Sequence, residues 1–261
     1  MFGRLKRNLF VQIMLTNDDG IYAPGLAALH DELVALGDVR VVSPATEQSG
    51  VGHSITFLTP LVAKKIFHGD EFWGWAVEGS PADCVKLGVF ELCPKPDLIV
   101  SGINGGLNAG INVLYSGTVA ASIEGAFFGI NSIAVSLEYD EHADFATAAK
   151  IAVKLIRQIV TNNTKQGQLF NINIPTAAIA NPQGVKVVPM GVARYGEHYI
   201  KRQDPKGRDY YWATNDPPPQ PDGTETDLTE LAAGFITVTP LDYDLTRHHA
   251  LDALRAWNFS L

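Results

Sequence analysis

The chain has 261 residues, of which 46% are hydrophobic and 18% are charged, and its formal net charge is −8. This composition is typical of a soluble protein with a core large enough for one α/β domain, or for a domain plus an appendage. No long basic run occurs, which argues against binding to duplex nucleic acid. No apolar run approaches the ~20 residues of a membrane span, so we expect no membrane partner.

Residues 1–10 superficially resemble a basic targeting region, but the apolar stretch that follows is short and runs into acidic residues, so we expect no signal peptide. The two cysteines are Cys84 and Cys93. If both lie on one helix, the ~100° between successive residues places them on opposite faces, which excludes a disulfide between them. Two free thiols are typical of a reducing cytoplasm, which is the location that we expect.

An apolar run at residues 11–15 predicts a buried strand, and the sequence Asp18, Asp19, Gly20 follows it after two polar residues. Polar residues at the carboxyl end of a strand build binding sites in open α/β sheets. Two adjacent carboxylates repel each other unless a proton or a cation lies between them, and a divalent cation bound through oxygen resolves this at neutral pH. The alternative interpretation is that Asp19 caps the next helix and Asp18 is merely solvated.

Strands and helices then alternate, which is typical of βαβ units and a parallel sheet. Helices are predicted over residues 24–36, 80–92, 118–128 and 145–160. Strands are predicted over residues 39–42, 55–67, 72–77, 97–101, 132–137 and 169–174, the last being the expected final strand of the core. On the 72–77 strand, Trp73 and Trp75 are expected to share one face. Ser80 as cap and Asp83 in the first turn mark a helix start.

The pattern changes from Pro175 onward. Further strands are predicted over residues 185–188, 195–200, 210–212 and 235–239, with a loop at 217–223 and a terminal helix at 246–257. We therefore predict an α/β fold, namely a three-layer αβα Rossmann-like core with a mostly parallel sheet in residues 1–175. Residues 176–261 are predicted to form a C-terminal extension with a hairpin and a terminal helix, which packs on the core and contacts or exchanges with a partner subunit.

Three predicted loops meet at the carboxyl edge of this sheet, and they offer oxygen donors. They contribute Asp18 and Asp19, then Ser49 among glycines, and then Asn104. No His/Cys cluster with zinc spacing occurs, which favours a hard ion such as Mg²⁺, Mn²⁺ or Ca²⁺ over zinc. Taken alone, Ser49 and Asn104 also fit an ordinary turn or cap role.

The helix predicted after Ser116, Gly117 and Thr118 offers free backbone N–H groups at its first turn. Such a helix start is where a phosphate group settles, although the same three residues also fit a simple helix cap. A cation held by carboxylates beside an anion-binding helix start describes metal-assisted phosphoryl chemistry. The glycine-rich loop lacks the GK[ST] of a P-loop, so NTP hydrolysis is not predicted.

Five segments, in order, resemble the signature motifs of the SurE family of survival protein E nucleotidases: LTNDDGIYAPGL, SPATEQSGVGHSIT, GSPADCVKLG, DLIVSGINGGLNAG and YSGTVAASIEGA. A later segment, ITVTPLDYDLT, resembles the C-terminal segment of that family, and the resemblance covers residues 12–254. Two departures are Ala45, where an acid often follows the proline, and Ser80, where Thr is usual. The resemblance implies a divalent-metal-dependent phosphatase that hydrolyses nucleoside 5′- and 3′-monophosphates, with polyphosphate as a further substrate of some members.

The resemblance also implies roles for individual residues. One divalent cation per subunit (Mg, Mn, Co or Ca) would be held by Asp18, Asp19, Ser49 and Asn104. Asp18 and Asp19 are also the predicted catalytic residues, with either water or an aspartate as the nucleophile. Phosphate or substrate contacts are predicted for Asn108, Ser116, Gly117 and Thr118.

Two nearby residues have a structural and a chemical interpretation. His53 fits an acid or base as well as a hydrogen-bonded structural histidine, and we favour the structural role. Asp83 is expected to stabilise its helix start rather than to act in catalysis.

The resemblance implies a homodimer or tetramer formed through the C-terminal region. The basic and aromatic segment 194–212 is expected to be a projecting hairpin for subunit contact, with covering of a nucleobase as the alternative. Asp244 and His248 resemble a hinge and exchange contact. A rival interpretation of the whole chain is a non-enzymatic phosphate-binding or receiver-like signalling module. Receivers require a third aspartate after a middle strand, where this chain has Ser101 and Gly102.

Overall fold

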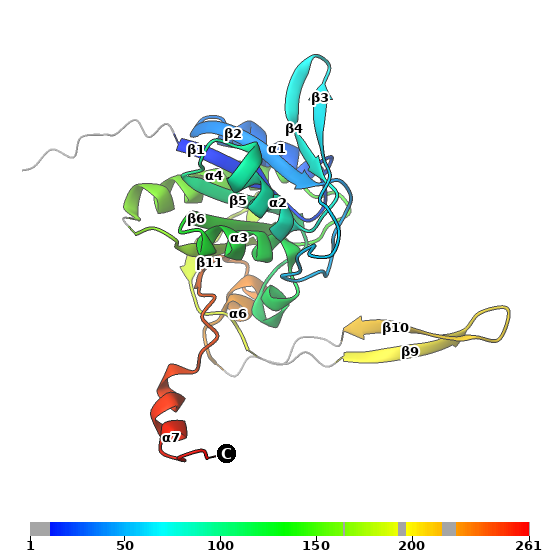
Figure 1. Cartoon of the computed structure of the whole chain (residues 1–261), viewed down its shortest axis with the longest axis vertical. Helices are drawn as coiled ribbons and strands as arrows, with labels where there is room; N and C mark the ends of the chain where they lie inside the picture. The colour runs from blue at the N-terminus through cyan, green and yellow to red at the C-terminus, as the bar shows by residue number, and fades with distance from the viewer. Residues whose placement is uncertain (1–10, 164, 193–196, 216–222, 261) are drawn as a thin grey trace, which may run out of the picture.

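The computed structural model describes residues 11–163, 165–192, 197–215 and 223–260 (Figure 1). The basic N-terminal tail, the start of the segment predicted as a hairpin at 194–212 and most of the loop predicted at 217–223 lie outside these residues.

Within the described residues, a nine-stranded sheet has the order β3-β4-β2-β1-β5-β6-β7-β11-β8. Its strands are β1 (Val11–Thr16), β2 (Gly37–Pro44), β3 (Ala63–His68), β4 (Glu71–Val77), β5 (Leu98–Gly105), β6 (Asn131–Leu137), β7 (Leu169–Ile174), β8 (Val185–Val187) and β11 (Ile236–Leu241). All pairs from β4 through β7 are parallel. β3 and β11 run antiparallel to β4 and β7, and β8 runs parallel to β11. The prediction of a mostly parallel sheet is confirmed.

Helices cover both faces of this sheet. One face carries α1 (Pro24–Leu33) and α4 (Phe145–Asn162), and the other carries α2 (Pro81–Leu87) and α3 (Gly117–Phe127) (Figure 1). Side chains alternate along β1 because successive residues of a strand point to opposite faces. Ile13 and Leu15 therefore pack under α1 and α4, whereas Met14 packs under α2 and α3. The three-layer αβα architecture follows from this alternation.

The helix starts follow the capping residues in the sequence. At α2 the hydroxyl of Ser80 accepts from the N–H of Asp83 at 3.1 Å, and the carboxylate of Asp83 accepts from the N–H of Ser80 at 2.9 Å. This capping box confirms the structural role expected for Asp83. A π-helical turn, Gly88–Leu92, continues α2 to the predicted end. Cys84 and Cys93 are both free thiols, as expected.

Two sequence-based expectations about strands were wrong. The sheet does not end at β7, because β11 pairs with β7 and β8 pairs with β11 beyond it. Trp73 and Trp75 do not share a face: Trp73 packs against the α1–α4 side and Trp75 against the α2–α3 side. The pairing register of β3 and β4 shifts between Ile66 and Phe67, and such an irregularity redirects the side chains that follow it.

The C-terminal part adds short elements, some of which project from the αβα body (Figure 1). They are α5 (Ala177–Ala180), β9 (Glu197–Gln203), β10 (Asp209–Asn215), α6 (Asp227–Ala232) and α7 (Leu251–Arg255). β9 and β10 form a separate antiparallel hairpin, as predicted. The terminal helix is shorter than predicted, with a 3-10 turn, His248–Ala250, ahead of α7. None of the helices in the described ranges is both long and apolar enough to cross a lipid bilayer.

Candidate active site

The two adjacent aspartates lie on a tight turn at the carboxyl end of β1. The side chain of Asn17 closes this turn: its amide nitrogen donates to the carbonyl of Gly20 at 3.0 Å, and its amide oxygen accepts from the N–H of Gly20 at 3.1 Å. The hydroxyl of Ser43, on β2, donates to the same amide oxygen. Gly20 has φ +99°, a conformation that residues with a Cβ rarely adopt. The turn therefore holds Asp18 and Asp19 in a fixed position.

Asp18 is almost buried, with 5% of its surface exposed. The hydroxyl of Thr118 donates to its Oδ1, and its backbone carbonyl accepts from the N–H of Gln48 at 2.7 Å. A Cβ atom at Gly117 would lie 2.8 Å from the Cβ of Asp18, which is closer than van der Waals contact allows. The absence of a side chain at Gly117 thus lets the start of α3 approach the Asp18 carboxylate.

Asp19 is less enclosed, and its Oδ2 accepts a long hydrogen bond of 3.4 Å from the N–H of Gly105 at the end of β5. Burial, with a contribution from the neighbouring Asp18 charge, raises the pKa of Asp19 from its ordinary value of 3.8 to about 6. Burial also raises the pKa of Asp18, against the opposing effect of the Thr118 hydroxyl. Glu47 adds further negative charge to both. Uncompensated negative charge of this kind favours a bound cation.

The two neutral candidate ligands each have one hydrogen-bonding group already engaged. The hydroxyl of Ser49 donates to a carboxylate oxygen of Glu47 at 2.6 Å, so the lone pairs of the serine oxygen remain for another partner. The amide nitrogen of Asn104 donates to the carbonyl of Gly106 at 2.6 Å. This hydrogen bond fixes the amide and leaves its oxygen without that bond, as a candidate ligand atom.

These side chains line one open cavity of about 280 Å³. All four predicted metal ligands line it: Asp18, Asp19, Ser49 and Asn104. Of the predicted phosphate contacts, Asn108 and Ser116 also line it, while Gly117 and Thr118 lie next to it through their contacts with Asp18. The prediction that the three loops meet at one edge of the sheet is confirmed, because residues from all three line this cavity.

Asn108 is held in place by hydrogen bonds to side chains of β6 and β7. Its N–H donates to the side chain of Asn173 at 2.8 Å, and its side-chain amide donates to the hydroxyl of Ser136 at 2.9 Å. Its carbonyl accepts from the side chains of Asn171 at 2.7 Å and Asn173 at 3.1 Å. Buried polar side chains on β6 and β7 therefore hold this loop residue at the cavity.

Ser116 is the N-cap of α3, and its hydroxyl accepts from the N–H of Val119 at 3.1 Å. The first N–H groups of a helix have no partner within the helix, so the N–H of Gly117 is available to an anion. The N–H of Thr118, like its hydroxyl, instead donates to the Asp18 carboxylate. The helix start lies against Asp18, which places an anion-binding position beside the carboxylates.

The sequence interpretation did not single out four residues of this site. Asn17 closes the aspartate turn, Glu47 binds the hydroxyl of Ser49, and Asn112 and Tyr115 line the cavity. An asparagine three residues before a glycine is a recognised turn signal, so Asn17 was predictable. The contact of Glu47 depends on a side-chain conformation, for which the sequence has no signal.

His53 does not line the cavity, and its Nε2 lies 2.6 Å from a carboxylate oxygen of Glu124 on α3. Among the described residues, no three His, Cys, Asp or Glu side chains gather as a metal cluster. A cation at Asp18 and Asp19 would therefore depend on the neutral oxygens of Ser49 and Asn104 as well. Such an all-oxygen donor set suits a hard divalent ion.

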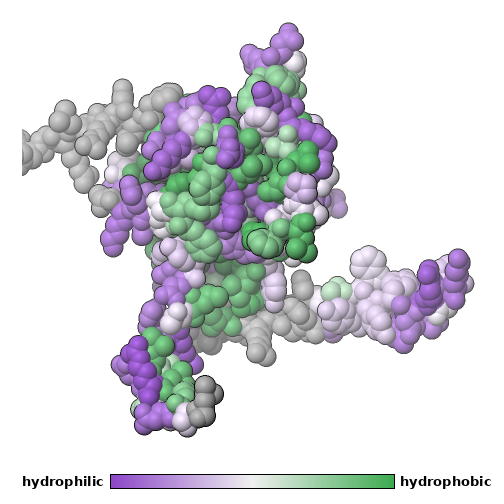
Figure 2. Space-filling model, in the orientation of Figure 1, coloured by the Kyte–Doolittle hydropathy of each residue, from purple (hydrophilic) through white to green (hydrophobic). Residues whose placement is uncertain are grey.

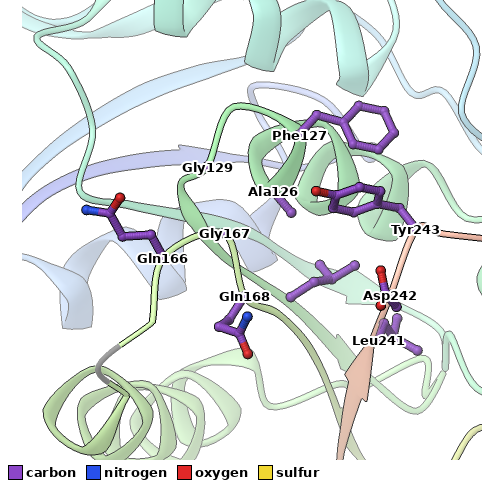
Figure 3. Close-up of a pocket in the computed structure, with 10 residues that line it drawn as sticks. Ala126, Phe127, Gly129, Gln166, Gly167, Gln168, Leu241, Asp242 and Tyr243 are labelled. Carbon is purple, nitrogen blue, oxygen red and sulfur yellow. The ribbon is translucent and has the colours of Figure 1, made fainter.

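A second, larger cavity of about 440 Å³ lies at the other end of α3 (Figure 3). The rings of Phe127 and Tyr243 meet edge-on at its wall, with centroids 4.6 Å apart. Asp242 supplies the single carboxylate in its lining, beside glutamine side chains and glycine backbone. None of the predicted site residues lines this cavity, so the smaller cavity at the carboxyl edge is the candidate active site.

The fold and this cavity define a Rossmann-like αβα protein with an oxygen-donor site at the carboxyl edge of a parallel sheet. The family model "Survival protein SurE" matches residues 13–197. The chain is 60% identical over 250 residues to the 5′-nucleotidase SurE of Rhodopirellula baltica, covering 95% of this chain and 99% of that protein. It is 44% identical over 249 residues to the 5′-nucleotidase SurE of Syntrophobacter fumaroxidans, covering 95% and 100%. The chain belongs to the SurE family.

A solved structure agrees with this assignment. The crystal structure of the SurE protein from Aquifex aeolicus superposes with a TM-score of 0.84 at 37% sequence identity. The superposition covers 95% of this chain and 100% of that chain. Family and fold are thus supported along nearly the whole length.

Proposed function

We propose that this protein is a divalent-metal-dependent phosphatase that hydrolyses nucleoside 5′- and 3′-monophosphates to nucleoside and phosphate, with short polyphosphate as a further substrate. Membership in the SurE family and the names of its relatives as 5′-nucleotidases support the substrate class. The observation that carries the proposal is the meeting of two carboxylates and the start of α3 at one cavity. With a cation between the carboxylates, this arrangement suits a phosphate ester, which requires positive charge and N–H donors together.

One divalent cation per subunit (Mg, Mn, Co or Ca) would be held by Asp18, Asp19, Ser49 and Asn104. The oxygen-only chemistry of these side chains and the raised pKa values of the two aspartates support this assignment. When bound, such an ion neutralises phosphate oxygens and lowers the pKa of a coordinated water.

The residues of the chain itself bind and orient the substrate in this proposal. The N–H of Gly117 binds the phosphoryl oxygens and stabilises the charge that develops on them, together with Ser116. Thr118 contacts the phosphate from beside the Asp18 carboxylate, to which its own N–H and hydroxyl donate. Asn108 contributes a further polar contact from its anchored loop. The hydroxyl of Thr118 holds the Asp18 carboxylate in one orientation.

Two routes follow for Asp18 and Asp19 as catalytic residues. In one, water that the two carboxylates orient attacks phosphorus, the ester bond to the nucleoside breaks, and the proton lost by water is balanced by the one that the nucleoside oxygen takes up. In the other, a carboxylate attacks phosphorus, the ester bond to the nucleoside breaks, and water then hydrolyses the aspartyl-phosphate. Asp19 is the less enclosed of the two and so is the better nucleophile in the second route. Trapping of phosphoenzyme in a single turnover separates the routes, because only the second one forms it.

Release of phosphate from AMP, with and without EDTA, tests the function. We expect EDTA to reduce turnover by about 100-fold or more, and added Mg²⁺ or Mn²⁺ to restore it. Asp18→Asn and Asp19→Asn should each reduce turnover by a similar factor, because each removes a charge from the ligand set. Asp31→Asn is the matched control, since that side chain is 79% exposed on α1. Turnover that survives both chelation and the Asp18→Asn and Asp19→Asn changes would contradict the proposal.

The receiver-like alternative is not favoured. The chain belongs to a family of proteins named as nucleotidases, and β5 ends in Asn104 and Gly105 without the third aspartate of a receiver.

The proposal includes assembly and location. We infer a homodimer or tetramer formed through the C-terminal region, supported by exposed large side chains on the β9–β10 hairpin and on the terminal arm, which comprises residues 242–260 after β11. The clearest are Tyr199, Tyr211, Trp212, Leu245, Trp257 and Phe259. Apolar side chains also gather along one side of the terminal arm in Figure 2. The two free thiols support a cytoplasmic location.

A further inference from the structure

The segment that carries Ser49 is fixed at two points close to that residue. On one side, the N–H of Gln48 donates to the carbonyl of Asp18 at 2.7 Å. On the other side, the N–H of Gly52 donates to the carbonyl of Tyr115 at 2.9 Å. Gly52 has φ +57°, which turns the chain there, and His53 follows directly. The position of Ser49 therefore depends on what holds this turn.

The side chain of His53 holds the turn to α3 by two contacts. Its Nε2 lies 2.6 Å from a carboxylate oxygen of Glu124, whose side chain is only 6% exposed. Its ring also stacks on Phe127, with centroids 5.3 Å apart and an interplanar angle of 24°. Both partners lie on α3, so one imidazole joins the segment to that helix through a polar and an aromatic contact.

Glu124 is itself held from a second side. The ammonium group of Lys86, on α2, lies 3.5 Å from its other carboxylate oxygen. The helix that carries Glu124, α3, also carries Thr118 at its first turn, and the hydroxyl of Thr118 donates to Asp18. α3 is thus a common support for the aspartate turn and for the segment that carries Ser49.

We propose that His53 is a positioning residue. Its hydrogen bond to Glu124 holds the segment 49–53 so that the Ser49 oxygen stays at the cavity that Asp18 and Asp19 line. His53 does not line the cavity and would contact neither the cation nor the substrate. The inference rests on the proposed function, because it assumes that Ser49 is a ligand. Supporting groups that fix a ligand in place typically contribute 10–100-fold to metal affinity.

Mn²⁺ affinity of the full-length protein, measured by calorimetry without substrate, tests the inference. We expect His53→Ala to weaken Mn²⁺ binding about 10-fold, while turnover at saturating Mn²⁺ stays within about threefold of the wild type. His53→Gln should restore the affinity, because its amide nitrogen reaches the position of Nε2 and can donate to Glu124. His53→Asn should fail to restore it, because its amide is too short. Unchanged affinity in His53→Ala would overturn the inference, as would equal behaviour of the Gln and Asn variants.

Two further variants separate positioning from general effects. His68→Ala removes another stacked histidine, which lies 4.7 Å from the ring of Trp73 on the β3–β4 hairpin, away from the site. Lys86→Met removes the ammonium group beside Glu124 but keeps the contact between His53 and Glu124. Both should bind Mn²⁺ within about threefold of the wild type. A tenfold loss in Lys86→Met would overturn the inference, because the charge of Glu124 would then be the decisive factor.

The outcome for Asp19→Asn distinguishes failure of this inference from failure of the proposed function. If Asp19→Asn loses Mn²⁺ binding but His53→Ala retains it, only the positioning role is wrong. If Asp19→Asn binds Mn²⁺ as well as the wild type, the proposed metal site itself is wrong. Thermal unfolding of each metal-free variant confirms that it is folded before its affinity is compared.

Discussion

Asp18 and Asp19 are adjacent in sequence but have different surroundings. Asp18 is nearly buried against Gly117 and accepts from the hydroxyl of Thr118, whereas Asp19 has only a long bond to the N–H of Gly105. Neither carboxylate has a lysine or arginine partner among the described residues. Two close carboxylates without a cationic side chain destabilise the folded protein when both are ionised. A bound divalent ion removes this cost, so the stability of the protein and its metal affinity are linked at these residues.

This arrangement predicts that the metal-free protein becomes less stable as pH rises from 4 to 6, which is opposite to the usual effect of a carboxylate that has a cationic partner. The folded-state pKa of Asp19 is about 6, above its ordinary value of 3.8. Between these values the folded state binds more protons than the unfolded state, so the free energy of unfolding falls as pH rises. The full difference corresponds to about 3 kcal/mol, and partial exposure of Asp19 reduces it to about 1–2 kcal/mol. Urea unfolding of the EDTA-treated protein from pH 4 to pH 7 measures this loss.

Asp19→Asn provides the comparison, because the pH-dependent contribution of Asp19 is absent from that variant. The difference in unfolding free energy between wild type and variant should change across pH 4–6 and level off above pH 6. Adding Mg²⁺ or Mn²⁺ at pH 7 should stabilise the wild type more than the variant. A difference that stays constant from pH 4 to pH 7 would show that the pKa of Asp19 is not raised.

At the level of strands and helices, local patterns predicted what depends on neighbours in sequence. Ser80 and Asp83 cap α2 as predicted, and of the residues 116–118 that fit a cap of α3 it is Ser116 that forms it, because capping depends on residues within one turn. The order of strands at the sheet edge was not predictable in the same way. β11 pairs with β7 more than 60 residues earlier in the chain, and only long-range packing selects that partner.

The candidate site shows the same division. The residues that follow a strand and face the carboxyl edge were predictable, because parallel topology fixes which ends of strands meet. The contacts that tie the loops together were not, because they join segments far apart in the chain. Asp227 is an example: it was absent from the sequence interpretation, yet it is fully buried and joins three segments.

We therefore expect Asp227, at the start of α6, to contribute strongly to stability. Its carboxylate accepts from the N–H groups of Gly110, Gly191 and Leu228, each at 2.8 Å. Asp227→Ala leaves these buried donors unpaired and should lower the free energy of unfolding by about 3–4 kcal/mol. Asp227→Asn keeps one acceptor oxygen and should cost about half as much. Urea unfolding at a fixed protein concentration measures both changes.

An exposed substitution provides the reference for Asp227. Asp31→Ala, on the surface of α1, should change the unfolding free energy by less than about 0.5 kcal/mol. If Asp227→Ala were no less stable than Asp31→Ala, the three hydrogen bonds would not be a net source of stability. A smaller loss in Asp227→Ala than in Asp227→Asn would contradict the acceptor argument in particular.

For the molecule as a whole, the αβα body and the terminal arm differ in how much of their apolar side chains is exposed. Most residues of the buried clusters lie in the sheet and in the helices that cover it. The terminal arm instead exposes Leu245 at 84%, Trp257 at 67% and Phe259 at 79% of their surfaces (Figures 1 and 2). Large apolar side chains exposed together mark interaction sites. Since the predicted metal ligands and phosphate contacts all belong to one chain, we expect assembly and chemistry to be separable.

Deletion of residues 245–261 tests this separation. The deletion keeps the edge-on contact between Tyr243 and Phe127 and every residue of the cavity, but it removes the exposed apolar groups of the arm. We expect the wild type to be a dimer or tetramer by light scattering, and the truncated chain to form a smaller species, because burial of these side chains favours association. Turnover of AMP per chain should stay within about fivefold of the wild type at saturating metal, since no metal or phosphate contact is removed.

A second variant, Tyr211→Ser with Trp212→Ser, tests by the same mass measurement whether the β9–β10 hairpin contributes to assembly. An unchanged mass after deletion would exclude the arm as the assembly element, and loss of turnover with an intact fold would show that the arm contributes to the site.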